Sequence, residues 1–189
     1  MEFSISNIIS QVKELLFTPS AFWKAIKEET RGSKMLWVNY LLPILLVVAI
    51  AVFVGEFFKR TDFFIEYPLL KALREIALFV LQYFIGVWVT AELMKTFGAE
   101  KNLDIARKLV VYSMTPLLLV SILTGLFPFL YVLDIVGMYS FYIFWVGAKE
   151  LLKFPENKDQ SYILITIVAN FFIFSFLSVL LSKLLNAYY

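Results

Sequence analysis

The chain has 189 residues, of which 61% are hydrophobic and 17% charged, and its formal net charge is +2. It contains neither cysteine nor histidine, which excludes disulfides, a Cys/His zinc site, a thiol nucleophile and a histidine base. The small net charge gives no reason to expect nucleic-acid binding. Soluble domains are nearer half apolar and a quarter charged, so this composition indicates an integral membrane protein.

Residues 1–34 precede the first long apolar block and have a pattern of their own. Apolar side chains recur at three- and four-residue spacing, which predicts an amphipathic helix: Ile5, Ile8, Ile9, Val12, Leu15 and Leu16. A second helix is predicted from "TPSAFWKAIKEE", in which Phe22, Trp23 and Ile26 share a face. These helices could lie in the membrane interface or pack under the rest of the protein, and the two interpretations are compatible.

Residues 35–189 are predicted to form one five-span transmembrane domain. Apolar blocks of about twenty residues are long enough to cross about 30 Å of hydrocarbon. We expect five such helices, over residues 36–58, 72–97, 109–127, 130–148 and 162–185. The predicted fold is therefore an all-α membrane protein, a five-transmembrane-helix bundle with N-terminal interfacial amphipathic helices.

Residues 109–148 contain only one charged side chain, Asp134. We interpret them as two spans joined by a tight turn, with Gly125 and Pro128 marking that turn. One bent span with a buried loop would leave backbone groups unpaired in lipid. Pro43 and Pro116 are predicted to kink the first and third spans.

The basic residues predict the orientation of the spans. They are concentrated before the first span and in the connections between spans two and three and between spans four and five. The positive-inside rule then places the N-terminus in the cytoplasm and the C-terminus outside, as an odd number of spans requires. We expect a multi-pass protein of the cell membrane that contacts membrane lipids, with protein partners at the cytoplasmic N-terminus.

Polar residues inside spans are the default functional candidates because they are expensive in hydrocarbon. The candidates are Gln82, Glu92, Asp134 and Asn170. Asp134 could contact an ion or a lipid headgroup; we favour the alternative, a water-accessible carboxylate in the first turn of a helix. Glu92 could line a cytoplasm-facing cavity, but a pair with Lys95 or Lys108 is the better interpretation. Asn170 is expected to hydrogen-bond between helices.

Small residues form stripes on spans three and four, and these stripes could serve either the bundle itself or a homo-oligomer. No residues form a catalytic set, a phosphate loop or a workable pair of carboxylates. We therefore expect no enzyme activity and no cofactor.

Two stretches carry a family resemblance: "FGAEKNLDIARKLVVYSMTPLLLVSILTGLFPFL" and "IVGMYSFYIFWVGAKELLKFPENK". They resemble the Yip family of Ypt/Rab-interacting membrane proteins, through many weak matches that include Gly98, Tyr112, Ser113, Pro116, Tyr139, Ser140, Tyr142, Gly147, Pro155 and Lys158. The resemblance implies a five-helix domain with a cytoplasmic N-terminus and, in eukaryotic members, vesicle trafficking with small GTPases. The Asp-Leu-Tyr-Gly-Pro motif of those members is absent, since residues 31–43 read "RGSKMLWVNYLLP". The chain resembles a compact prokaryotic-type member.

Three hypotheses about function follow. The first is a non-enzymatic adaptor that organises the membrane or acts in trafficking through its N-terminal helices. The alternative is a lipid scramblase or a transporter of small solutes or ions that uses the intramembrane polar residues. A membrane enzyme is the third and the weakest.

Overall fold

A computed structural model describes residues 5–29, 36–59, 65–155 and 158–188, and every regular element in these ranges is helical. Two elements depart from the α-helix: η1 is a π-helical turn and η2 is a 3₁₀ helix. The elements in chain order are α1 (Ile5–Phe17), α2 (Pro19–Glu28), η1 (Trp37–Leu41), α4 (Leu42–Lys59), α5 (Glu66–Thr96), α6 (Leu103–Ser113), α7 (Thr115–Leu126), η2 (Pro128–Met138), α8 (Tyr139–Leu151) and α9 (Asp159–Tyr188).

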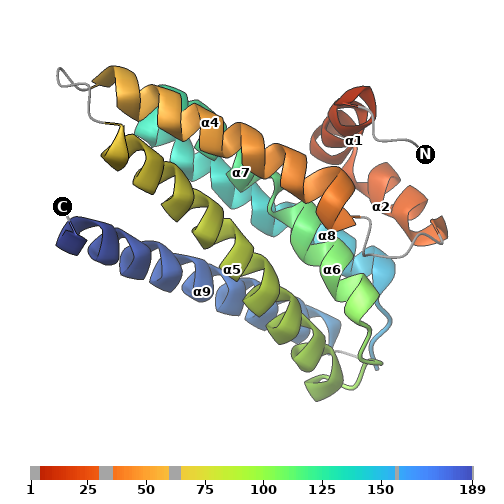
Figure 1. Ribbon diagram of the computed structural model, residues 1–189. Helices are drawn as coiled ribbons and strands as arrows, with labels where there is room; N and C mark the ends of the chain where they lie inside the picture. The colour runs from red at the N-terminus through yellow and green to blue at the C-terminus, as the bar shows by residue number, and fades with distance from the viewer. Residues whose placement is uncertain (1–4, 30–35, 60–64, 156–157, 189) are drawn as a thin grey trace.

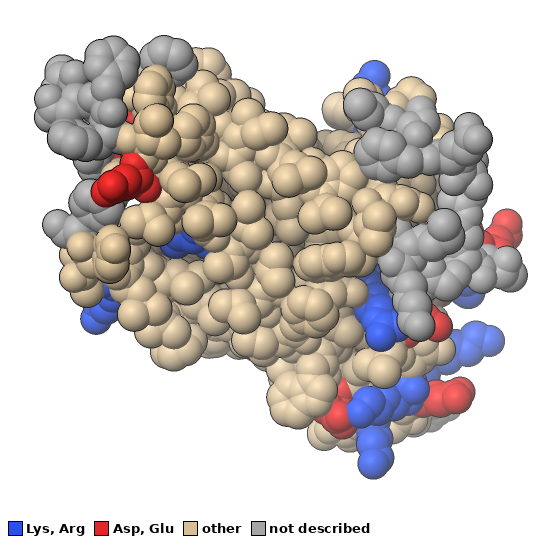
Figure 2. All heavy atoms as spheres, viewed as in Figure 1, with Lys and Arg blue, Asp and Glu red and all other residues tan. Residues whose placement is uncertain are grey.

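The predicted all-α, five-span membrane bundle is confirmed. Five stretches are long and apolar enough to cross a membrane: Trp37–Phe57, Glu66–Thr96, Leu103–Leu126, Pro128–Leu151 and Asp159–Tyr188. Most of them extend several residues beyond the predicted limits, because the helices continue past the apolar blocks that defined those limits. Figure 2 shows the charged side chains gathered mainly at the two ends of the molecule, with a largely uncharged band between them, as a bilayer requires.

The helices run roughly along one axis, and the two termini lie at opposite ends of it (Figure 1). We call the end that carries α1 and α2 the N-terminal end, and the end where α4 finishes and α5 begins the C-terminal end. Helix α5 packs between α4 and α9, while α7 packs against α4 and η2. Helix α9 packs against α5 and α8 and has few contacts with α7 or η2. Arg31 and Lys34, which precede the first span, and residues 60–64 of the predicted loop between spans one and two lie outside the described residues.

The two prolines predicted to kink spans one and three lie at irregular points of the helices. Pro43 is the second residue of α4 and follows η1, where the backbone N–H of Leu42 donates to the carbonyl of Trp37, five residues earlier. Proline has no N–H and clashes with the carbonyl four residues before it, so a wider π turn accommodates it. Pro116 follows the short break at Met114 between α6 and α7.

The prediction that Gly125 marks the turn between spans three and four is wrong. Gly125 is still helical, near the end of α7; the turn falls at Phe127, before Pro128. The role of Gly125 is close packing, since a Cβ there would lie 2.8 Å from Val52 Cγ2 of α4. A Cβ on Gly55 would in turn lie 1.9 Å from the carbonyl oxygen of Gly125. The backbones of α4 and α7 therefore touch at two glycines, as small residues allow in membrane helices.

The fourth span is not the uniform α-helix that its apolar sequence predicts. Its first part, Pro128–Met138, is 3₁₀ helix, and α8 takes over at Tyr139. A 3₁₀ helix rises about 2.0 Å per residue against about 1.5 Å in an α-helix. The element is interrupted at Leu130 (φ −85°, ψ 19°). Asp134 lies four residues past this break, about 8 Å further along, in the middle of η2 instead of in a first helical turn.

Helix α2 is fastened to the bundle through the face that its sequence predicts. Phe22, Trp23 and Ile26 are buried. The indole Nε1 of Trp23 donates to the carbonyl of Ile143, 3.1 Å away in α8. A Cβ on Gly147 would lie 2.4 Å from the Trp23 ring, so this glycine makes room for the indole. Helix α1 is less enclosed, because Ile9 and Phe17 are exposed.

Candidate functional site

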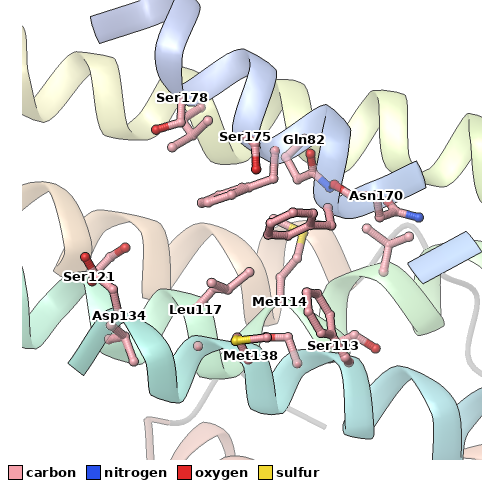
Figure 3. A pocket seen from close by; sticks show the side chains of 18 of the residues that line it. Gln82, Ser113, Met114, Leu117, Ser121, Asp134, Met138, Asn170, Ser175 and Ser178 are labelled. Carbon is pink, nitrogen blue, oxygen red and sulfur yellow. Dashed lines mark hydrogen bonds between the residues drawn. The ribbon is translucent and has the colours of Figure 1, made fainter. Parts of the chain in front are cut away.

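A cavity of about 550 Å³ lies inside the bundle, between α5, α9, the α6–α7 pair and the η2–α8 pair. Its walls are mostly apolar, with rings of Phe141, Phe144, Phe171 and Phe174 among them. Polar groups come from every wall. At one end in Figure 3 lie Ser121, Asp134 and Ser178, and at the other lie Gln82, Asn170 and Ser113. The volume falls in the range of ordinary small-molecule sites, about 300–1,000 Å³.

The polar residues fall at two depths. Arg74 lies about 12 Å along α5 from Glu66, at much the same depth as Asp134 on η2. Gln82 lies about 24 Å from the same helix start, so it is near the middle of the bundle. The cavity therefore runs from a charged level in the C-terminal half of the bundle, which contains Arg74, Glu75 and Asp134, to a neutral polar level near its centre, which contains Gln82 and Asn170.

Arg74 is tied into the charged level by several partners. Its Nη1 donates to Glu75 Oε1 at 2.5 Å. Its Nη2 donates to the carbonyl and the Oγ of Ser178 and to the Oγ of Ser182, each at 2.8 Å. A guanidinium held by a carboxylate and three oxygens is well suited to a low-dielectric site. The side chain therefore joins α5 to α9 and neutralises Glu75.

Asp134 differs from Arg74, since it makes no hydrogen bond or ion pair with any residue that the structure describes. It lines the cavity and is also exposed at the surface of the molecule. The cavity therefore opens to the surface of the molecule at a carboxylate in the middle of η2. A carboxylate at this depth is costly in lipid without a partner.

Near the centre, Gln82 and Asn170 hold α5 and α9 together. Gln82 Nε2 donates to Asn170 Oδ1 and to its carbonyl, both at 3.3 Å. Asn170 Nδ2 donates to Thr90 Oγ1 at 3.3 Å and to the Thr166 carbonyl at 2.9 Å. Gly86 leaves the space for this amide, because a Cβ there would lie 2.6 Å from Asn170 Oδ1. Asn170 therefore hydrogen-bonds between helices, as its sequence context predicts.

Three buried polar atoms of the lining have no hydrogen-bond partner among the described residues: Gln82 Oε1, Ser113 Oγ and Ser140 Oγ. Their residues are 4%, 7% and 5% exposed, respectively. A buried polar group without a partner costs about 1–3 kcal/mol. Such groups gathered on one cavity can bind water or the polar part of a ligand.

Glu92 does not belong to the cavity. Its carboxylate pairs with Lys101 at the N-terminal end, beyond the end of α5. The predicted partners were Lys95 and Lys108, but the partner in the structure is Lys101. The ammonium of Lys108 donates instead to the carbonyls of Ile26 and Glu29, at 3.1 and 3.0 Å. These are carbonyls at the C-terminal end of α2, which lack partners within the helix. Of the four candidates, Gln82, Asp134 and Asn170 meet in one cavity.

Sequence reasoning missed the charged residues of the C-terminal half. Arg74 and Glu75 lie inside the predicted second span, residues 72–97, but are not among the candidates predicted from the sequence. Glu56 was also missed; it is buried on α4 and accepts a 2.6 Å bond from Lys71 Nζ on α5. The available signal was simply the presence of charges inside predicted spans.

Comparison with protein families gives one match, to the Yip1 domain, over residues 13–179. The chain belongs to the Yip1-domain family. The match runs from within α1 to within α9, and so it includes the first four spans, most of the fifth and every polar residue of the cavity. Searches of curated proteins and of solved structures found no significant match. This Yip-family protein is therefore a multi-pass membrane protein whose helices contact lipid.

Proposed function

We propose that this Yip-family protein is a non-enzymatic lipid-binding protein that carries lipid headgroups through its intramembrane cavity, as a scramblase does. The observation that carries the proposal is the mouth at Asp134, where a partly polar cavity opens on the side of a membrane span. A headgroup needs polar partners inside the bilayer while its acyl chains stay in lipid. The limited contact between α9 and the α7–η2 pair leaves room for this arrangement.

Blocking the cavity should stop lipid movement. Ser121 lines the cavity, whereas Leu123, two residues further along α7, is exposed. In proteoliposomes with fluorescent lipids, wild-type protein should let dithionite bleach the inner-leaflet probe, and Ser121→Trp should reduce the rate about tenfold or more. The matched control Leu123→Trp should keep the wild-type rate. Folded wild-type protein that leaves the inner leaflet protected would refute the proposal.

The adaptor function is a second candidate, and the exposed side chains of α1 favour it. Trp23 and the 3.4 Å ion pair between Lys27 and Glu150 hold α2 against α8. Helix α1, which precedes α2, is therefore attached to a helix of fixed position. Phe17, at the end of α1, is largely exposed. An exposed aromatic side chain at this end suits either a protein partner or the headgroup layer.

One thiol can test both this candidate and the orientation, since the chain has no cysteine. We expect Phe17→Cys, in intact cells, to resist an impermeant maleimide and to react once the membrane is permeabilised, because the basic residues favour a cytoplasmic N-terminus. A thiol-anchored photocrosslinker should then give a discrete protein adduct. Labelling in intact cells would reverse the orientation, and adducts with lipid alone would leave α1 as an interfacial helix.

A further inference from the structure

The spare hydrogen-bonding capacity of the cavity indicates the chemistry of its ligand. Its side-chain amide donors are already used: Gln82 Nε2 donates to Asn170, and Asn170 Nδ2 donates to Thr90 and Thr166. Both terminal nitrogens of Arg74 have partners: Nη1 donates to Glu75, and Nη2 donates to Ser178 and Ser182 of α9. An anionic group would therefore find the cation and the amides of this cavity engaged.

What remains is dominated by acceptors. Asp134 offers a carboxylate without a partner among the described residues, and Gln82 Oε1 is a carbonyl oxygen that can only accept. The hydroxyls of Ser113 and Ser140 can donate or accept. Because Glu75 is neutralised by Arg74, the lining has one uncompensated negative charge, at Asp134.

A ligand that satisfies these groups must bring donors and a positive charge. A primary ammonium has three donors and no acceptor. Because Asp134 and Gln82 line opposite ends of the cavity, an ammonium group meets them in turn. It pairs with Asp134 at the mouth, and after moving inward it donates to Gln82 Oε1 and the serine hydroxyls. A trimethylammonium group carries the charge without donors, and a glycerol headgroup carries hydroxyls without the charge, so each satisfies only part of the set.

We propose that the cavity recognises a primary ammonium group at two successive positions, with Asp134 as its counter-ion at the mouth and, further along the cavity, the unpartnered oxygens of Gln82, Ser113 and Ser140 as its acceptors. This inference rests on the proposed function, because it names the headgroup that the cavity carries. The surrounding apolar walls, including Leu117 and Phe171, would contact the rest of an amphipathic molecule.

The test compares headgroups in proteoliposomes. The scrambling rates of fluorescent lipids with ethanolamine, choline or glycerol headgroups are measured for the wild type, for Asp134→Asn and for Glu92→Gln. The ethanolamine lipid should move about tenfold faster than the glycerol lipid, the value expected for a charge-assisted hydrogen bond. Asp134→Asn should remove this preference, and Glu92→Gln, the same change outside the cavity, should retain it. Equal rates for all headgroups in wild type, unchanged in Asp134→Asn, would overturn the inference and leave the proposed function standing.

A binding measurement separates the inference from the proposed function. Native mass spectrometry of protein released from mixed vesicles should show retained ethanolamine lipid in wild type and about tenfold less in Asp134→Asn. If no lipid is scrambled, this retention still supports the ammonium site, and its absence overturns it. A third measurement distinguishes a free amine from a lipid headgroup. If soluble ethanolamine raises the melting temperature of the protein in glycerol-lipid vesicles, and Asp134→Asn abolishes this effect, the site binds a free amine. If the protein prefers the ethanolamine lipid but soluble ethanolamine does not raise its melting temperature, the site binds a headgroup.

Discussion

Gly55→Ala should lower the melting temperature of the protein by about 10 °C, although it adds only one methyl group. Its Cβ would lie 1.9 Å from the carbonyl oxygen of Gly125 and 2.9 Å from the carbonyl carbon. Backbone atoms cannot rotate away, so α4 and α7 must separate, at a cost of about 3 kcal/mol. Thermal unfolding of the protein in detergent, followed by tryptophan fluorescence, measures the shift.

The sign of the effect makes the experiment decisive. Alanine is a better helix former than glycine by about 1 kcal/mol, so without the close contact the substitution would stabilise α4. The matched control is Val47→Ile, which adds one carbon to a half-exposed residue of the same helix and should leave the melting temperature nearly unchanged. An unchanged or higher melting temperature for Gly55→Ala would mean that the two helices are not in backbone contact at this point.

Trp23→Ala should cost about 3–5 kcal/mol and release α2 from α8. Trp23 is 0% exposed and contacts both Phe22 and Tyr112 edge to face. The substitution removes these contacts and leaves the Ile143 carbonyl without its side-chain donor. We expect a lower melting temperature and faster proteolytic cleavage between α2 and the first span.

Trp88 provides the control, because it is the same residue type on α5 but is 61% exposed, toward the lipid. Trp88→Ala should change stability and cleavage little. Trp23→Phe should be intermediate, since it keeps an aromatic ring but loses the indole donor, worth about 1 kcal/mol. Equal behaviour of the two alanine variants would contradict the placement of α2 against α8.

The number of spans could be predicted because hydrocarbon thickness imposes a minimum length on each apolar block. The 3₁₀ course of η2 could not, since residues 128–138 have the composition of any apolar helix and only their packing beside α7 distinguishes them. The position of Asp134 differs accordingly: the α-helical prediction places the carboxylate near the helix start, whereas in the structure it lies in the middle of η2 and lines a cavity.

The ion pairs were harder to predict than the apolar contacts. Lys101 reaches Glu92 because the connection between α5 and α6 is short and turns back at Gly98, whose φ of 87° suits glycine. Lys108 turns to α2 because that helix ends beside it, a tertiary arrangement that spacing along the chain does not encode. Gln82 and Asn170 were identifiable because an amide inside a span requires a partner on another helix.

The turn at Phe127 has a consequence for biosynthesis. Leu126 ends one span and Pro128 begins the next, so no hydrophilic segment exists there to be translocated ahead of the fourth span. The third and fourth spans would therefore enter the bilayer together as a hairpin from the translocon. Asp134 would otherwise oppose insertion of its own helix, by up to about 3 kcal/mol at the bilayer centre. The third span, whose Ser121 lines the same cavity, can shield the carboxylate from lipid during insertion, which couples the topology of one span to the synthesis of the other.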